Sequence, residues 1–424
     1  MTSRERLFAL AQFGIKLGLD NITALVDALN RPDQAFPTVH VGGTNGKGSV
    51  TAMVERGLRA AGHRTGRYTS PHLTDIEERI VMDGDPIARA AFDEITTDVL
   101  GVVERLTASG VLPHPPTFFE VTTAIAFEAF RRAGVSAAVI EVGLGGRYDA
   151  TNVITPAVAA ITSIALDHER HLGTSLSQIA FEKAGIIKTG VPVVAGVMPA
   201  EAREVIAQAA RSKAARLVWA TPAATGSPVE LALNGAHQKQ NAAVAVEVLR
   251  LCGSFGRTVT RAQIAEALTD VDWPARLEWL RVPKAGDVLL DAAHNPAGAQ
   301  ALADYVLSAV GPLPLVCGVM RDKDVAGLVR ALAPAVSRFV ATTAPTRRAL
   351  AAPELAERIR GVAPEAVVEC RDDPIAAVHE TLGSAERVIV AGSIFLVGPV
   401  RAQLLAQGAA TVRYPSNASR FFLN

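Results

Sequence analysis

The chain lacks several features that would place it in a specialised class of protein. Among its 424 residues only three are cysteines, Cys252, Cys317 and Cys370, and no two of them form a CxxC pair. We therefore expect neither a disulfide framework nor a cysteine zinc site, and a reducing compartment, the cytoplasm, fits this composition. The longest largely apolar run, residues 388–400, contains two glycines and a proline and is shorter than the about 20 residues of a membrane-spanning helix.

An excess of charge of either sign is also absent. Lys plus Arg and Asp plus Glu number 42 each, so the formal net charge is zero. Nothing in the overall charge favours nucleic acid or an anionic membrane, and we expect neither as a partner. The apolar stretch at residues 7–15 is followed by Lys16 without a small-residue cleavage site, and we interpret it as structure. A chain of this length with 49% hydrophobic residues is expected to form at least two packed domains.

Strand and helix patterns alternate along the chain. Residues 37–42 are predicted as a strand, residues 46–61 as a helix, and residues 137–142 and 157–166 as buried strands. This alternation indicates a parallel sheet. Asp83-Gly84 is typical of a two-residue hairpin turn. Further helices are expected at residues 89–106, 118–132, 176–187, 201–213 and 238–251.

The pattern breaks at Trp273-Pro274 and again near residue 283, where we place a domain boundary. A large domain is expected over residues 1–282, and a smaller Rossmann-like α/β domain over residues 283–424. Since such folds host many chemistries, the function has to be inferred from the sites. The strands of the smaller domain are expected at residues 287–291, 313–319, 339–342, 367–369 and 387–391.

A glycine-rich turn joins the first predicted strand to its helix, in the segment HVGGTNGKGS that ends at Ser49. Glycines let backbone N–H groups approach a phosphate, Lys47 adds a charge and Ser49 a hydroxyl for Mg²⁺. The strict GxxxxGK[ST] pattern fails, because Val41 replaces its first glycine and Gly48 separates the lysine from the serine. A turn that only starts a helix therefore stays an alternative. The residues expected to contact a nucleotide are Thr44, Asn45, Gly46, Lys47, Gly48 and Ser49.

Polar residues also follow two other predicted strands. Glu141 ends one of them, and His168 ends the strand that we expect to run to residue 166. Because ligands bind outside the carboxyl ends of parallel strands, we expect Lys47, Glu141 and His168 to converge on one edge of the sheet. A carboxylate, a hydroxyl and an imidazole beside the phosphate loop would form a Mg²⁺ cluster. A structural turn and a structural histidine remain the alternatives. For Lys183, the alternative is a solvated helix charge paired with the preceding glutamate.

A further polar group lies in the smaller predicted domain. Asp291 and His294, in the segment DAAHNP, follow a strand, and Pro296 suits the start of a helix. A turn explains the Asn-Pro pair but not the acid and the histidine, which indicates a nucleotide or substrate role. Asn241 and Arg276 are uninformative by themselves, and a surface or helix-capping role is the alternative for both.

Together these motifs resemble those of folylpolyglutamate synthases, including the bifunctional bacterial form that is also a dihydrofolate synthase. The likeness runs from about residue 18 to residue 398. The phosphate loop is shared with the wider Mur ligase superfamily, and the segments at 141–152 and 182–188 narrow the likeness to the folate branch. Glu169 stands where the family usually has threonine, and Ala292 replaces a common glycine. The segments that carry the resemblance are HVGGTNGKGS, SPHL, EVGLGGRYDATN, LDH, EKAGIIK and DAAHNP.

The resemblance implies a fold, an activity and partners. The fold would be a large Mur-ligase-like central α/β domain with a P-loop and a parallel sheet, plus a smaller Rossmann-like C-terminal domain. The activity would be that of an ATP-dependent carboxylate–amine ligase, which phosphorylates a folate carboxylate before the amine of L-glutamate attacks. Metal and lysine charges would stabilise the transferring phosphoryl group. Dihydropteroate would be a further substrate, ATP and two Mg²⁺ ions the cofactors, and the chain a monomer.

The resemblance also implies residue roles. Ser49 and Glu141 would hold one Mg²⁺, and Glu141, His168 and a carbamylated Lys183 the second. A carbamate would make the lysine an anionic oxygen donor, and it forms only on a neutral amine. Lys47, Lys183 and His168 would be catalytic. ATP would also contact Asn241, Arg276, Asp291 and His294. The acid substrate would contact Ser70, Phe118, Phe119, Arg147 and Asp149.

Two other functions compete with this interpretation. The first is a Mur-type ligase for a UDP-linked sugar peptide, which we rank low, because with the phosphate loop beginning at residue 42 we expect no UDP-binding domain before it. The second is a non-catalytic nucleotide-binding switch or a simple phosphohydrolase. Phosphate release separates them, since a ligase needs both folate and glutamate, a hydrolase needs neither, and a switch releases little.

Overall fold

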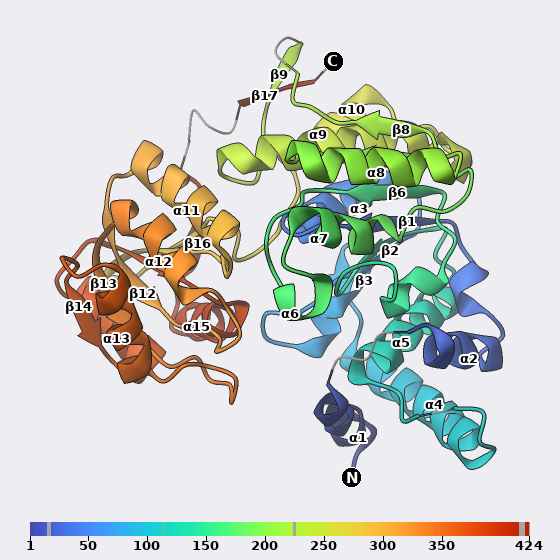
Figure 1. Ribbon diagram of the computed structural model, residues 1–424, viewed down its shortest axis with the longest axis horizontal. Coiled ribbons are helices and arrows are strands. Elements are labelled where there is room, and N and C mark those ends of the chain that lie inside the picture. The colour runs from blue at the N-terminus through green and yellow to red at the C-terminus, as the bar shows by residue number, and fades with distance from the viewer. Residues whose placement is uncertain (15–17, 113, 224–225, 415–419, 424) are drawn as a thin grey trace. The chain divides into compact units, whose positions relative to one another are not determined.

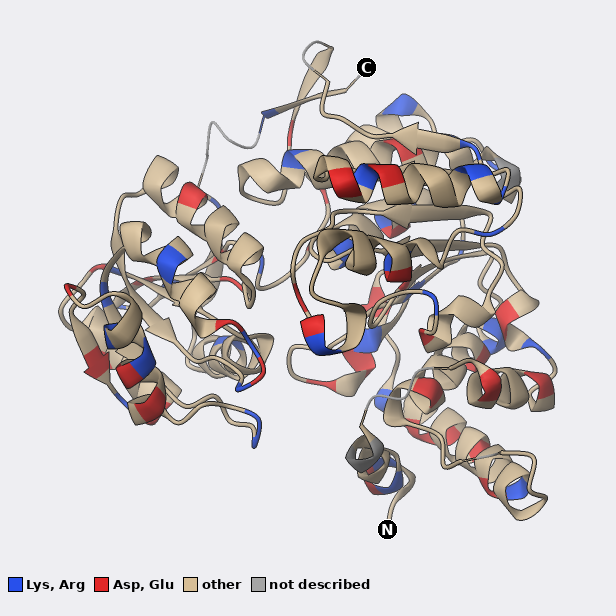
Figure 2. Cartoon of the chain, in the orientation of Figure 1, with Lys and Arg blue, Asp and Glu red and all other residues tan. Residues whose placement is uncertain are grey.

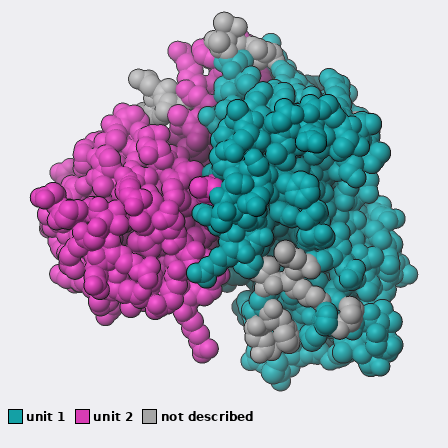
Figure 3. All heavy atoms as spheres, viewed as in Figure 1, with its two compact units in different colours: residues 1–165, 169–224, 240–271 teal, residues 166–168, 225–239, 272–424 magenta. Residues whose placement is uncertain are grey.

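The computed structural model describes residues 1–14, 18–112, 114–223, 226–414 and 420–423 (Figure 1). Contacts divide the chain into two compact units (Figure 3). Unit 1 comprises residues 1–165, 169–224 and 240–271, and unit 2 comprises residues 166–168, 225–239 and 272–424. The boundary that we expect near residue 283 falls between two paired strands of unit 2, whereas the contacts change over at residue 272. The limits 1–282 and 283–424 stay a prediction.

Unit 1 is built on an eight-stranded sheet. Its central strands pair in parallel, and only the pairings of β3 (Ile80–Met82) with its two neighbours at one edge are antiparallel. The two-residue turn predicted at Asp83-Gly84 joins β3 to the outermost strand at this edge. Across the sheet the order is β4 (Asp85–Pro86), β3 (Ile80–Met82), β2 (Thr65–Tyr68), β5 (Ala137–Glu141), β1 (Thr38–Gly42), β6 (Val158–Ile161), β7 (Val193–Ala195) and β8 (Leu217–Trp219).

Helices cover both faces of this sheet (Figure 1). The expected helix at residues 118–132 is found with the same bounds, and the others agree within a few residues. The helix expected at 176–187 ends at Ala184, because the chain then turns through Gly185. The helices are α1 (Ser3–Ala9), α2 (Asp20–Ala28), α3 (Lys47–Ala60), α4 (Arg89–Ala108), α5 (Phe118–Arg132), α6 (Glu169–Leu172), α7 (Leu176–Ala184), α8 (Ala200–Ser212), α9 (Ala236–Leu251) and α10 (Arg261–Thr269).

One predicted strand is too long. The strand expected over residues 157–166 ends at Ile161, so His168 does not directly follow a strand. After Ile161, Thr162 N donates to Gly42 O at the end of β1, and the next residue, Ser163, accepts through its backbone O from Thr44 N in the turn after β1. The predicted strand is too long because the sequence stays largely apolar after Ile161, where the hydrogen-bond ladder of β6 stops.

Unit 2 contains a second sheet of seven strands. Five of them pair in parallel, and the pairings of β10 (Glu278–Val282) with its two neighbours at one edge are antiparallel. The order is β14 (Val368–Cys370), β13 (Val336–Ala341), β12 (Leu313–Cys317), β15 (Arg387–Ala391), β11 (Gly286–Leu290), β10 (Glu278–Val282) and β16 (Ala410–Val412). Its helices are α11 (Pro296–Ala309), α12 (Val325–Leu332), α13 (Ala352–Val362), α14 (Pro374–Leu382) and α15 (Ile394–Ala406). A separate two-stranded sheet pairs β9 (Ser227–Glu230) with β17 (Arg420–Leu423).

The central strands of both sheets are buried on both faces, which is typical of parallel sheets. All five residues of β1 and of β5 are buried, and so are the last four residues of β11 and β15. Lys and Arg are interspersed with Asp and Glu in both units, in keeping with the zero net charge (Figure 2). Of the described helices, none is long and apolar enough to span a membrane. The α/β fold with two sheets is the class that the sequence predicts.

Candidate functional site

The turn after β1 requires glycine at two positions. Gly43 has φ +141° and Gly46 has φ +83°, and both angles are unfavourable for other residues. A Cβ atom on Gly43 would lie 1.9 Å from Thr162 Oγ1, and one on Gly46 would lie 2.2 Å from Asn241 Oδ1. The turn is therefore shaped by its neighbours as well as by its own sequence, and backbone N–H groups can approach an anion there.

Two hydroxyl side chains after β6 hold this turn in place. Thr162 Oγ1 donates to Asn45 O at 2.6 Å. Ser163 Oγ donates to the same oxygen at 3.0 Å and accepts from Asn45 N at 3.1 Å. Our reading of the sequence missed both residues. The signal was present, since a Thr-Ser pair follows a buried strand that neighbours the strand of the phosphate loop.

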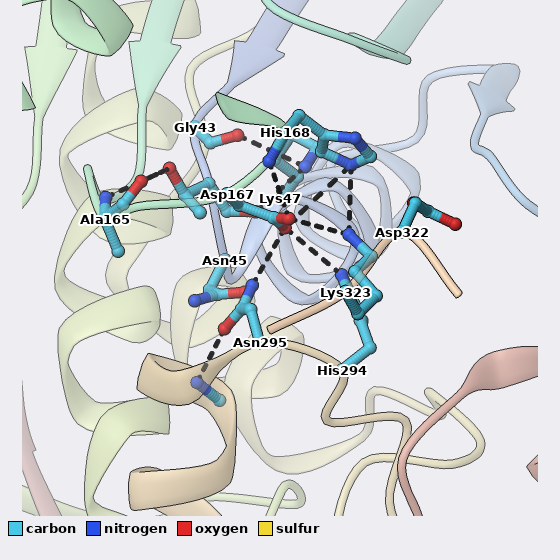
Figure 4. Close-up of polar contacts among 12 residues, drawn as sticks. Gly43, Asn45, Lys47, Ala165, Asp167, His168, His294, Asn295, Asp322 and Lys323 are labelled. Carbon is cyan, nitrogen blue, oxygen red and sulfur yellow. Dashed lines mark hydrogen bonds and ion pairs between the residues drawn. The ribbon is translucent and has the colours of Figure 1, made fainter. Parts of the chain in front are cut away.

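Two lysine side chains meet at one backbone oxygen in the same turn. Lys47 Nζ donates to Gly43 O at 3.2 Å and to Thr44 O at 3.1 Å (Figure 4). Lys183 Nζ, from α7, donates to Gly43 O at 2.9 Å. Because two amines and the N-terminus of α3 come together here, the turn concentrates positive charge where an anion such as a triphosphate can bind.

The predicted metal ligands of unit 1 are oxygen donors beside this turn. Ser49 lies in the first turn of α3 and is 2% exposed. Glu141, the last residue of β5, pairs in register with Val41 and is 5% exposed. One of its oxygens, Oε2, accepts from Ser70 N at 3.2 Å. A hydroxyl and a carboxylate at the carboxyl end of parallel strands suit a hard divalent cation such as Mg²⁺.

Lys183 is not a solvated helix charge. It is 5% exposed, and the preceding Glu182 binds Arg147 instead, with Arg147 Nη2 2.7 Å from Glu182 Oε1. The guanidinium of Arg147 also lies over the rings of Tyr148 and Phe181, at 4.5 and 4.8 Å. The alternative for Lys183 that the sequence left open, an exposed pair with Glu182, is therefore wrong.

Asp149 organises the loop after β5. It is buried, and its Oδ2 accepts from Leu144 N at 2.8 Å while its Oδ1 accepts from Thr151 N at 3.0 Å. Burial raises the pKa of Asp149, although these donors oppose the shift. Thr151 also contacts His40 of β1, whose pKa burial lowers to about 3. These bonds fix the loop that carries Arg147.

The predicted substrate residues Phe118 and Phe119 begin α5. Phe119 lies against the backbone of Gly143, since a Cβ atom there would be 2.5 Å from its ring. Arg79 lies over the ring of Phe118 at 5.2 Å and donates through Nε to His72 Nδ1 at 2.9 Å. Burial lowers the pKa of Arg79, and burial together with Arg79 lowers the pKa of His72 to about 4.

A second polar cluster lies in unit 2 and centres on Asp167 (Figure 4). Its carboxylate contacts Lys323 Nζ at 2.6 Å, Asn295 Nδ2 at 3.0 Å and His294 Nε2 at 3.4 Å. Burial alone would raise the pKa of Asp167, but His294, His168 and Lys323 hold it far below its ordinary value. His168 has φ +53° and lies 3.4 Å from Lys323 Nζ.

Asp291 joins two segments of unit 2. It is 7% exposed, and its oxygens accept from Leu277 N at 2.9 Å and from Ala293 N at 2.8 Å. Burial raises its pKa, and the nearby Arg276 opposes this shift. Arg276 donates to Ala275 O at 2.8 Å. The carboxylate thus holds the segment before β10 against the segment after β11.

Known proteins are similar to this chain over most of its length. The Mur ligase glutamate ligase domain model matches residues 275–394. A dihydrofolate synthase/folylpolyglutamate synthase of Mycobacterium tuberculosis is 39% identical over 78% of this chain and 75% of its own. The folylpolyglutamate synthase of Lacticaseibacillus casei is 33% identical over 91% of this chain and 94% of its own. The chain belongs to the folylpolyglutamate synthase family.

Solved structures agree with this membership. The Mycobacterium tuberculosis folylpolyglutamate synthase complexed with ADP and AMPPCP is 32% identical, covers 95% of this chain and 98% of its own, and superposes with a TM-score of 0.85. A folylpolyglutamate synthase from Thermotoga maritima is 33% identical over 95% of this chain and 96% of its own, with a TM-score of 0.80. The Mur-ligase-like two-domain α/β architecture is thereby confirmed.

In this member of the folylpolyglutamate synthase family, the structure sorts the predicted site residues into two groups. The phosphate loop, Glu141 and Lys183 lie with Asn241 in unit 1. His168, Arg276, Asp291 and His294 lie in unit 2. The sequence pointed to neither Asp167 nor Lys323. The signal for the lysine is the charged run Arg321-Asp322-Lys323-Asp324, which directly precedes α12.

Proposed function

We propose that the protein joins L-glutamate to the carboxylate of a folate at the expense of ATP, through an acyl phosphate. The observation that carries this proposal is the meeting of Lys47 and Lys183 at Gly43 O, in a turn whose glycines are sterically required. Membership of the folylpolyglutamate synthase family names the acid and the amine. The positive charge of the turn can stabilise the negative charge of the phosphoryl group that is transferred.

The reaction would proceed in two steps at the phosphate loop. Backbone N–H groups of the turn and Lys47 bind the triphosphate and neutralise charge that develops on the γ-phosphoryl group. A carboxylate oxygen of the folate attacks the γ-phosphorus, and ADP leaves. The neutral amine of glutamate then attacks the acyl carbon, the amide forms, and inorganic phosphate and one proton are released.

Divalent metal fits the donors of the site. Ser49 and Glu141 would hold Mg²⁺, which supplies charge neutralisation to the phosphates when bound. Solved relatives support nucleotide and divalent metal, since one bifunctional enzyme was crystallised with Mn, AMPPNP and L-glutamate. That structure is 29% identical, covers 96% of this chain and 98% of its own, and has a TM-score of 0.82.

The proposal also includes a second Mg²⁺ ion and a carbamate on Lys183. Lys183 is buried and bonded to the phosphate loop, so a carbamate on Nζ would place anionic oxygens beside the triphosphate. Glu141 would be a further ligand of that second ion. Dihydropteroate is proposed as a second acid substrate, because several relatives carry the dihydrofolate synthase name. Ser70, Phe118, Phe119, Arg147 and Asp149 are proposed to bind or shape the acid site.

Substrate-dependent phosphate release tests this function. Purified protein is incubated with MgATP, then with tetrahydrofolate or dihydropteroate, with L-glutamate, and with acid and glutamate together. We expect phosphate release to rise only when both are present, and in equal amount to the new amide. Release without either substrate would indicate a phosphohydrolase, and no release under any condition would indicate a switch.

A further inference from the structure

One aromatic side chain of the N-terminal helix is exposed where a buried ring would be ordinary. Phe8, the sixth residue of α1, is 43% exposed. Its ring stacks on that of Phe118, with centroids 5.7 Å apart and planes 24° apart. An aromatic ring that is stacked on one neighbour and still largely open to solvent offers a flat apolar surface to a ligand.

The position of Phe8 is fixed by the residues around it. The preceding Leu7 is fully buried. Arg4 on the same helix binds Glu77 at 2.5 Å and Asp93 at 2.9 Å. A capping box at Thr2 closes the first turn. Because α1 is held at its start and at its buried face, the exposed ring is presented in one place, and little conformational entropy is lost when a ligand covers it.

A continuous line of contacts connects this ring to the phosphate loop side of unit 1. Phe118 and Phe119 are neighbours at the start of α5. Phe119 lies against Gly143, which follows Glu141 by two residues. Glu141 accepts from Ser70 N at 3.2 Å. A folate is an elongated acid with a carboxylate at one end and a fused heteroaromatic ring at the other. Glu141 pairs in register with Val41 of β1, and the turn after β1 binds the amines of Lys47 and Lys183, so the line runs from a cationic turn to an aromatic end.

We propose that Phe8 is a specificity-determining residue, which stacks its exposed ring on the fused heteroaromatic ring of the acid substrate. This inference rests on the proposed function, since that function supplies the substrate class. The ring of Phe8 and the guanidinium of Arg79 both lie against the ring of Phe118. The open surface of the aromatic pair therefore belongs to Phe8, and α1 becomes part of the acid site.

The test compares an acid that has the heterocycle with one that lacks it. Initial rates are measured for the wild type, Phe8→Ala and Phe8→Tyr, with tetrahydrofolate and with p-aminobenzoyl-glutamate. We expect Phe8→Ala to raise the KM for tetrahydrofolate about tenfold, the size of one lost aromatic stack, and to leave its kcat, its KM for p-aminobenzoyl-glutamate and its KM for ATP unchanged. Phe8→Tyr keeps the ring and should keep the wild-type KM.

Val111→Ala serves as the matched control, because Val111 is an apolar side chain of unit 1 that is 55% exposed, and it should leave every constant unchanged. An unchanged KM for tetrahydrofolate in Phe8→Ala, or an equal rise with both acids, would overturn the inference. Direct calorimetric binding of tetrahydrofolate to the wild type and to Phe8→Ala decides the matter independently of turnover. If the wild type ligates no glutamate to any acid, the proposed function fails, while equal affinity of the two proteins would defeat only the role of Phe8.

Discussion

Lys47 and Lys183 share one acceptor, the carbonyl oxygen of Gly43, although 135 residues lie between them in the sequence. One lysine comes from the start of α3 and the other from the end of α7. Their convergence places two amines at the carboxyl end of β1, the site at which parallel sheets bind ligands. Several consequences of this arrangement can be measured.

Replacement of Lys47 by alanine should lower kcat by about 100-fold or more, because a charge aimed at the transferring phosphoryl group is lost. The measurement is folate- and glutamate-dependent phosphate release by purified protein. Lys213→Ala, at an exposed position in the same unit, is the control and should retain full activity. Wild-type turnover in the Lys47→Ala protein would contradict the role of this residue.

Replacement of Lys183 by alanine should also abolish turnover, and small carboxylates such as formate or acetate should restore part of it. A short carboxylate can occupy the space of a carbamate and supply the same anionic oxygens. Activity is measured against carboxylate concentration, with Lys47→Ala as a variant that the same additives should not rescue. Full activity of Lys183→Ala without any additive would defeat the carbamate proposal.

Removal of the Thr162 hydroxyl should loosen the phosphate loop. In Thr162→Val the donor to Asn45 O is lost while the shape of the side chain is kept, and the free energy of unfolding should fall by about 1 kcal/mol. The Kd for ATP should rise, since the loop is less well ordered. Urea unfolding and calorimetric titration measure the two effects, and Thr97→Val, at an exposed threonine of α4, is the control. Wild-type affinity and stability would show that the loop holds its shape alone.

Stability should decrease as the pH falls below 6.5. The folded protein keeps His40 and His72 neutral, with pKa values of about 3 and about 4, whereas both take up a proton in the unfolded chain near 6.5. The unfolded state therefore binds more protons between pH 6.5 and about pH 4, and each histidine lowers the free energy of unfolding by up to about 1.4 kcal/mol per pH unit.

Urea unfolding at pH 7.5, 6.5, 5.5 and 4.5 measures this slope. His40→Gln should flatten it, and His114→Gln, at an exposed position, should not. The same slope in the wild type and in His40→Gln would show that His40 is not kept neutral by its burial in β1.

Much of the fold could be predicted from the sequence. The apolar run of β5 and the helical period of residues 118–132 reflect local pattern and burial, which sequence reports directly. The phosphate loop was found because its glycines and lysine are adjacent in the chain. The end of β6 was not predicted, because Ile164 and Leu166 continue the apolar run after the hydrogen-bond ladder stops. Only the hydrogen bonds to the neighbouring turn show where the strand ends.

The missed site residues are those whose chemistry depends on distant partners. Thr162 and Ser163 are ordinary residues until the fold places Asn45 beside them. Asp167 acquires its charged neighbours only through a loop that folds with unit 2. In the same way, nothing in the sequence separates Phe8 from other apolar residues of an N-terminal helix, and its exposure is a property of the packed chain.

Transfer of an isotope label from the acid to phosphate tests the central claim most directly. Tetrahydrofolate with ¹⁸O in its terminal carboxylate is incubated with the protein, MgATP and L-glutamate, and the released phosphate is analysed by mass spectrometry. If the carboxylate takes the γ-phosphoryl group before the amine attacks, each phosphate carries one ¹⁸O atom. Phosphate that contains no ¹⁸O while amide is formed would contradict the acyl phosphate and with it the account of the site.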